Sequence, residues 1–107
     1  MATLSKGTTA VIFVAQRTGA DEEGYARAAA AMDALSALQP GYIGMDSVRG
    51  DDGLGITVSY WESDAAAKAW RDHPDHAGIR DAGRDRWYSD YSLHVGNITR
   101  SYDWEKP

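Results

Sequence analysis

Residues 8–17 read Thr-Thr-Ala-Val-Ile-Phe-Val-Ala-Gln-Arg, a continuous run of β-prone residues that predicts a strand. Side chains along a strand point alternately to its two faces. The central positions are apolar on both faces, with Val11, Phe13 and Ala15 on one side and Ala10, Ile12 and Val14 on the other. The run therefore indicates a strand whose two faces are both buried.

The segments after this strand change from a helical to an extended pattern. Residues 21–39 carry an apolar stripe at helical spacing and begin with three acidic residues, which the helix dipole favours at that end. Pro40-Gly41 ends this predicted helix. Residues 42–49 and 54–61 are predicted as two short strands, joined by a hairpin loop of sequence Gly-Asp-Asp-Gly.

The second half of the chain repeats the change from helix to strand. Ser63 is a good N-cap for a helix that runs to residue 73. Pro74 breaks that helix and can itself open the next one, which is expected to run to about residue 86. Residues 91–102 are predicted as a final strand, and the tail 103–107 as a loose end.

The order β-α-β-β-α-β is that of a ferredoxin-like α+β sandwich, here a single domain over residues 1–107 with its core at about 8–102. Helices of this fold cover only one face of the sheet, yet the strand at 8–17 is apolar on both. The second cover is therefore expected from another chain, which predicts a homodimer packed sheet to sheet. The alternative is that the seven-residue N-terminal arm covers that face.

Composition excludes several classes of function. The chain has 43% hydrophobic and 25% charged residues, as expected of a soluble globular protein. Its net charge of −5 and the lack of a basic stripe argue against a nucleic-acid partner, and the absence of cysteine excludes thiolate sites. The apolar runs are too short for a membrane span, and the first six residues lack the apolar segment of a signal peptide. A cytoplasmic protein without a membrane partner is the expectation.

Trp70 is the first candidate binding residue. It lies in the middle of the predicted helix that starts at Ser63, in register to face inward. It can serve simply as a large core residue. Because its helical neighbours are mostly alanines, it can also form the aromatic wall of a pocket for a flat ligand.

Polar residues near Trp70 supply candidate chemistry. His76, or else His73, can act as a general base near neutral pH, or one of them can simply cap a helix. No third ligand stands at a recognised spacing from the two histidines, so no metal site is expected. Arg80 lies one turn after His76 and can hold an anion or form a salt bridge, and Gln16 is a lone amide on an apolar strand face.

A string of residues in the second half resembles the antibiotic biosynthesis monooxygenase family over about residues 9–102. The string comprises Trp61-Glu-Ser-Asp, Trp70, His73-Pro-Asp-His76, Gly83 and Trp87-Tyr88-Ser-Asp-Tyr91. The resemblance implies a dimeric α+β barrel, the assembly also expected from the strand at 8–17. It further implies a pocket between sheet and helices, in which Trp70 matches a pocket tryptophan and Gln16 stands where a pocket asparagine occurs.

Two activities follow from this resemblance. The first is a cofactor-independent monooxygenase that acts with O2 on a small, flat aromatic or polyketide-type molecule, with His76, His73 and Arg80 as catalytic residues and Trp61, Trp70 and Gln16 at the substrate. The second is a haem-binding or haem-degrading protein. Haem-degrading relatives bind iron through a histidine ten residues beyond the tryptophan, where this chain has Arg80, so haem stays an alternative. A non-catalytic dimer that binds a small ligand is a further one.

Overall fold

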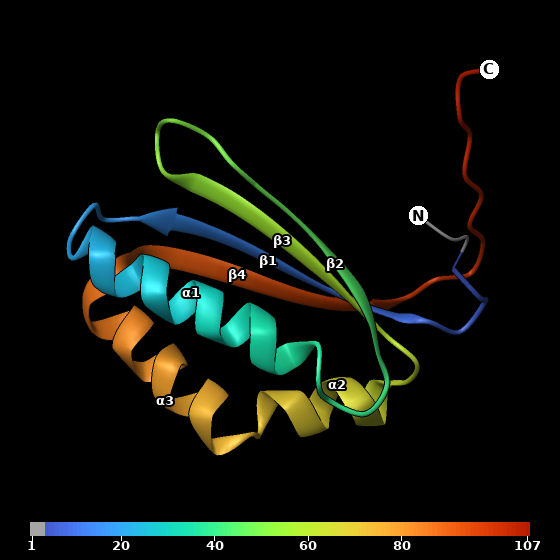
Figure 1. The fold of residues 1–107 in the computed structure, drawn as a ribbon, viewed down its shortest axis with the longest axis horizontal. Coiled ribbons are helices and arrows are strands. Elements are labelled where there is room, and N and C mark those ends of the chain that lie inside the picture. The colour runs from blue at the N-terminus through green and yellow to red at the C-terminus, as the bar shows by residue number, and fades with distance from the viewer. Residues whose placement is uncertain (1–3) are drawn as a thin grey trace.

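A computed structural model describes residues 4–107, which form one antiparallel four-stranded sheet with helices on one side of it (Figure 1). The elements in chain order are β1 (Thr9–Arg17), α1 (Glu22–Ser36), β2 (Tyr42–Arg49), β3 (Leu54–Trp61), α2 (Asp64–Arg71), α3 (Pro74–Ala82), a π-helical turn η1 (Gly83–Trp87) and β4 (Tyr88–Asn97). The sheet order is β2-β3-β1-β4. This arrangement confirms the predicted ferredoxin-like α+β fold.

The most apolar strand lies inside the sheet, because β1 pairs with β3 on one side and β4 on the other. The register places Phe13 opposite Thr57 of β3 and Leu93 of β4, and directly paired residues share one face. The ring of Phe13 contacts Tyr88, and Arg17 contacts Tyr25 of α1. The odd-numbered side chains of β1 therefore face the helices.

The even-numbered side chains of β1 share the opposite, helix-free face with a set of apolar residues. We call this set the open face: Ile12, Val14, Val48, Leu54, Ile56 and Val58. Val48 is 69% exposed and Ile56 39% in the single chain. The described part of the N-terminal arm, residues 4–7, does not cover this face, because it lies against residues 98–101 at the end of the sheet (Figure 1). The sheet-to-sheet homodimer stays a prediction.

Both hairpin strands have the predicted bounds, and the helix boundaries differ by small amounts. The first helix ends at Ser36 instead of residue 39, because Leu38 and Gln39 donate to carbonyls three residues back and tighten the end of the helix. The next helix ends at Arg71 instead of residue 73. Pro74 begins α3 as predicted, with His73 as its N-cap.

The last part of the chain is where the sequence prediction was wrong. The helix expected to reach residue 86 ends at Ala82 and continues as the π-helical turn η1, and the strand expected at 91–102 spans Tyr88–Asn97. β4 starts early because Tyr88 pairs with Arg17 across an irregularity in β1, and it ends where β1 ends, since Asn97 pairs with Thr9. Residues 98–107 contain no helix or strand. Within the described residues, no helix has both the length and the apolar character needed to cross a membrane.

Candidate functional site

Four of the six predicted site residues form one group, the aromatic–histidine cluster of Trp61, Trp70, His73 and His76. Trp70 of α2 lies between two rings, with its centroid 6.4 Å from that of Trp61 and 4.4 Å from the stacked imidazole of His76. The ring of His73 is 5.6 Å from Trp70. The structure thus brings together residues from the end of β3, from α2 and from α3.

Three polar atoms of this cluster already have partners. The Nδ1 atom of His73 accepts from the backbone N–H of Asp75 and caps α3, at 3.2 Å. The Nδ1 atom of His76 lies 3.0 Å from the carbonyl oxygen of Trp70. The indole N–H of Trp61 donates to Ser59 Oγ at 2.9 Å. These bonds give the cluster a structural role whether or not it also has a chemical one.

Burial sets the protonation of the half-buried His76. Desolvation is the largest cause that lowers the pKa of its imidazole, and the nearby charges of Arg80 and His73 act in the same direction. The hydrogen bond with the Trp70 carbonyl opposes this shift. His76 is therefore a neutral imidazole at pH 7 and can accept a proton at Nε2.

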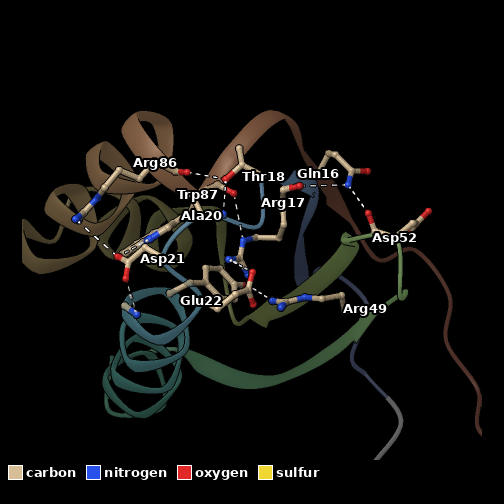
Figure 2. Close-up of polar contacts among 12 residues, drawn as sticks. Gln16, Arg17, Thr18, Ala20, Asp21, Glu22, Arg49, Asp52, Arg86 and Trp87 are labelled. Carbon is tan, nitrogen blue, oxygen red and sulfur yellow. Dashed lines mark hydrogen bonds and ion pairs between the residues drawn. The ribbon is translucent and has the colours of Figure 1, made fainter.

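Arg80 lies near His76 of this ring stack, whereas Gln16 lies far from it. Arg80 donates from Nη1 to the carbonyl oxygen of Arg71, at 3.3 Å, and so closes the C-terminal end of α2. Gln16 lies at the far end of β1: it pairs with Leu54, whereas Trp61 pairs with Thr9, and seven residues of strand span about 23 Å. The structure does not bring Gln16 to Trp70. The Nε2 atom of Gln16 instead donates to the Asp52 carbonyl at 2.7 Å (Figure 2).

A cavity of about 270 Å³ lies between α1 and the sheet, and none of the predicted site residues lines it. Its lining comes from five elements: Phe13, Ala15 and Arg17 of β1, Tyr25 of α1, Ser47, Val48 and Arg49 of β2, Gly55 and Thr57 of β3, and Tyr88 of β4. We call this the arginine–tyrosine cavity. Aromatic rings and two guanidinium groups meet in it.

Arg17 is the most buried charged group of this cavity, with a side chain only 4% exposed. Its Nε donates to the Trp87 carbonyl at 3.2 Å, and its Nη2 forms an ion pair with Glu22 at 2.9 Å (Figure 2). Its guanidinium carbon lies 3.4 Å from the centre of the Tyr25 ring, a cation–π contact. The remaining atom, Nη1, is buried and has no hydrogen-bond partner among the described residues.

Two tyrosines and a second arginine complete the cavity. Arg49 donates from Nη2 to the hydroxyl oxygen of Tyr25. The Tyr88 ring packs edge-on against Phe13 and Tyr25, at 5.4 Å and 6.1 Å between centroids. Burial, and next the neighbouring Tyr25, raise the pKa of the Tyr88 phenol, so that it stays neutral and can donate a hydrogen bond.

Gly83 explains how Tyr88 reaches this position. A Cβ atom at residue 83 would lie 2.8 Å from Cε2 of the Tyr88 ring, closer than such atoms approach. The glycine in η1 therefore leaves the space into which the phenol packs. In the sequence, Gly83 was noted only as one of the residues that resemble the family.

Sequence reasoning missed Arg17, Tyr25 and Arg49. One signal was available, because Arg17 has the same strand parity as Phe13 and Ala15 and therefore had to point to an apolar face. A charge at such a position needs partners, and it marks a candidate binding site.

Comparison with known proteins agrees with the resemblance noted in the sequence. A family profile described as "Antibiotic biosynthesis monooxygenase" matches residues 8–82, well over half of the chain. This chain belongs to the antibiotic biosynthesis monooxygenase family. A relative in Bacillus subtilis (strain 168), the uncharacterized protein YqjZ, is 44% identical over 91 residues, which cover 85% of this chain and 79% of YqjZ.

Solved structures show the same fold as this family member. A protein from Nitrosomonas europaea, described as a candidate antibiotic biosynthesis monooxygenase, aligns with a TM-score of 0.76 at 15% identity over 89% of this chain and 93% of its own. SnoaB, a cofactor-independent oxygenase from Streptomyces nogalater, aligns with a TM-score of 0.71 at 19% identity, over 90% of this chain and 96% of its own. At these identities the likeness concerns the fold.

Proposed function

We propose that this chain is a cofactor-independent, monooxygenase-like enzyme that oxidises a small, flat, electron-rich aromatic molecule with O2 in the arginine–tyrosine cavity. The observation that carries the proposal is the cavity itself, where aromatic walls meet the guanidinium groups of Arg17 and Arg49. Membership of the family and the fold shared with SnoaB support it.

The chemistry needs no external electron donor, because the substrate supplies all the electrons. When a ring CH2 group becomes a carbonyl, two C–H bonds break and four electrons leave the carbon. One oxygen atom of O2 enters the new carbonyl, and the other takes up the two protons and becomes water. The protein has to hold the deprotonated substrate away from bulk water and stabilise its negative oxygen.

The cavity offers groups for both tasks. Phe13, Tyr25 and Tyr88 contribute aromatic walls, and the guanidinium groups of Arg17 and Arg49 supply positive charge beside the space. A guanidinium beside a phenol lowers the phenol pKa, so an acidic substrate can bind as its anion. Removal of one such donor lowers turnover by about a hundredfold in other enzymes.

The aromatic–histidine cluster is a second candidate location for proton transfer. The neutral imidazole of His76 stacks 4.4 Å from Trp70 and has its Nε2 atom available, which favours a role as the base, with Trp61 and Trp70 as a wall for the substrate. In this version His73 and Arg80 assist His76, whereas Gln16 lies outside the site.

A haem group does not fit this chain at the position from which haem-degrading relatives bind iron. Residue 80 is an arginine there, and its guanidinium bonds to the Arg71 carbonyl and offers no electron pair to a metal. The cavity of about 270 Å³ lies below the range of about 300–1,000 Å³ typical for drug-sized ligands. A molecule of one or two fused rings suits it better.

We also propose that two copies pack through the open face. Val48 and Ile56 lie exposed on the helix-free side of the sheet, opposite the face that carries Arg17. A small domain buries little surface alone, and a second sheet would cover this apolar set. The cavity lies between α1 and the other side of the sheet, and Val48 of the edge strand β2 belongs to the open face and also borders the cavity.

Oxygen uptake by the purified protein tests the function, with anthrone-like phenols and naphthols as substrates and no added metal. We expect uptake that depends on the phenol, survives a chelator, and falls about a hundredfold in Arg17→Gln. A strong loss in His76→Ala combined with normal uptake in Arg17→Gln would move the reaction to the aromatic–histidine cluster. A complete lack of uptake with every phenol would contradict the proposed activity.

A further inference from the structure

The arginine–tyrosine cavity opens to solvent along β2. The exposed residues of its lining all lie on this strand: Ser47, Val48 and Arg49. β2 is an edge strand, at one end of the order β2-β3-β1-β4. The lining residues from the other elements are buried or half-buried. A ligand that enters the cavity therefore passes between β2 and α1.

The side chain of Arg49 crosses this opening. Its Nη2 atom donates to the hydroxyl oxygen of Tyr25 on α1, and its Cζ atom lies 4.5 Å from the centre of the Tyr25 ring. Figure 2 shows the Arg49 side chain extended toward the first turn of α1. The hydroxyl pair of Ser47 and Thr57, 2.9 Å apart, joins β2 to β3 within the sheet. The contact between Arg49 and Tyr25, which we call the gate bridge, instead joins the edge strand to the helix.

Gly55 leaves room for the gate bridge. It pairs with Arg49 in the ladder between β2 and β3, so both positions face the helix side of the sheet. A Cβ atom on residue 55 would lie 4.0 Å from Nε of Arg49, which places the arginine side chain over the glycine. A larger residue at this position would fill the space that the guanidinium needs when it turns toward or away from Tyr25.

The gate bridge is held more weakly than the neighbouring Arg17. Arg17 is buried, pairs with Glu22 and donates to the Trp87 carbonyl. Arg49 is exposed, and among residues 4–107 no carboxylate forms an ion pair with it. A hydrogen bond and a cation–π contact to one neutral residue are weak at an exposed site. Since exposed side chains change rotamer within nanoseconds, the bridge can open and close rapidly.

We infer that the gate bridge controls access to the arginine–tyrosine cavity: a flat ligand enters and leaves while Arg49 is turned away from Tyr25, and the bridge closes again over the bound ligand. The inference rests on the proposed function, because it describes entry to the same cavity. A closed bridge keeps bulk water away from a deprotonated substrate.

A fast gate has a kinetic signature. The association rate constant scales with the fraction of free protein in which the bridge is open, and the dissociation rate constant scales with the open fraction of the complex. Loss of the bridge should therefore raise both rate constants and change their ratio, the dissociation constant, much less. A residue that only contacts the bound ligand changes mainly the dissociation rate constant.

Stopped-flow fluorescence with 2-naphthol as the probe measures both rate constants, under nitrogen so that no O2 is consumed. In Arg49→Ala we expect both to rise by about tenfold, which corresponds to about 1.4 kcal/mol, the size of one hydrogen bond. Tyr25→Phe keeps the ring and removes only the hydroxyl group, so both constants should rise there as well. Arg27→Ala removes an exposed arginine of α1 outside the cavity lining and should bind as the native protein does.

A thiol at position 49 tests the gate in the opposite direction. The chain has no cysteine, so a maleimide modifies Arg49→Cys at that residue alone. The unmodified variant should bind 2-naphthol faster than the native protein, and a bulky maleimide should slow both rate constants below the native values. The same maleimide on Arg27→Cys should leave binding unchanged. Circular dichroism checks that each variant is folded.

Native rate constants in folded Arg49→Ala would overturn the inference, and so would a change confined to the dissociation rate constant. A maleimide-modified Arg49→Cys that binds as fast as the unmodified variant would also overturn it. The same holds for a lack of 2-naphthol binding to both the native protein and Arg49→Ala, since an open mouth should admit the probe.

Oxygen uptake with the phenols is measured separately and separates the two proposals. Gated binding of 2-naphthol without uptake of O2 by any phenol would keep the gate and remove the oxygenase. Uptake of O2 together with unchanged binding rates in Arg49→Ala would do the reverse.

Discussion

The aromatic–histidine cluster and the arginine–tyrosine cavity lie at opposite ends of β1 and differ in how their polar atoms are used. In the cluster, both imidazole Nδ1 atoms and the indole N–H of Trp61 have partners, and the rings pack on one another. In the cavity, two arginines and two tyrosines line an open volume. A packed group of residues stabilises a fold, whereas charged and polar groups that converge on a space are typical of a binding site.

The largest expected effect tests the structural role of the cluster. Trp61 has no exposed surface, and Trp61→Ala removes a ring that contacts Tyr42 and Trp70. We expect the free energy of unfolding to fall by about 3–5 kcal/mol, as measured by urea denaturation. The matched control is Trp104→Ala in the C-terminal tail, where the side chain is 77% exposed and little change is expected. Similar losses in both variants would show that Trp61 is not a core residue.

The second prediction asks whether either region depends on a partner chain. Ile56→Asp puts a carboxylate on the open face, where a second sheet would bury it at a cost of several kcal/mol. We expect light scattering to give a dimer of the 11.7 kDa chain for the native protein and a monomer for the variant. Leu38→Asp, an exposed position beyond α1, should remain dimeric.

A monomeric native protein would contradict the sheet-to-sheet dimer. If Ile56→Asp is monomeric and still takes up O2 with the phenols, the cavity is complete within one chain. The aromatic–histidine cluster and the arginine–tyrosine cavity would then both form within a single chain.

The third prediction concerns the support of the cavity. Gly83→Ala places a methyl group 2.8 Å from the Tyr88 ring and should lower the free energy of unfolding by about 1–3 kcal/mol through overpacking, while it lowers O2 uptake. Gly78→Ala in α3 is the matched control. Nothing lies within 4 Å of its new Cβ, so it should stabilise the protein by about 0.4–1 kcal/mol. Thermal unfolding and oxygen uptake of both variants measure the two effects.

The smallest expected effect is the pH dependence of the cluster. Burial, as the largest cause, lowers the pKa of His76 below its ordinary value of 6.5, so the unfolded chain binds a proton more readily than the folded one. The unfolding free energy should therefore be highest above pH 6.5 and should fall as the pH drops from 6.5 toward the lower pKa of the folded state. Arg80, His73 and the Trp70 carbonyl are the groups that face this imidazole.

Urea denaturation between pH 7.5 and 5 measures this slope, and His76→Gln should reduce it. His94→Gln controls for the loss of a histidine elsewhere, since this imidazole of β4 is exposed in the single chain. Because His94 lies opposite Ile12 on the open face, the two variants are compared in the Ile56→Asp background. An unchanged slope in His76→Gln would show that the imidazole is not held neutral by burial. It would also weaken the case for His76 as a base.

Local signals in the sequence predicted most of the fold. The two apolar faces of the strand at 8–17, the hairpin loop at 50–53, the cap at Ser63 and the break at Pro74 all depend on residues close together in the chain, and the structure has each of them. The same holds for the cluster, whose tryptophan and histidines stand within seven residues and pack as neighbouring turns of helix would.

The cavity could not be predicted in this way, because its walls come from five elements. Strand parity placed Arg17 on the helix side, but its distance from Tyr25 and Arg49 depends on the register of β1 with its neighbours and on the path of α1. The early start of β4 has the same origin, since it follows from an irregularity between Gln16 and Arg17 that no local pattern marks.

The sequence by itself thus determined the fold class, the hairpin, the helix break and the resemblance to the family, all of which depend on periodicity and on residues adjacent in the chain. Only the tertiary structure decided that Trp70 lies between Trp61 and His76, that Gln16 lies far from them, and that Arg17, Tyr25 and Arg49 meet at one cavity. The physical reason is that hydrogen-bond satisfaction and empty volume are set by side chains brought together from distant parts of the chain.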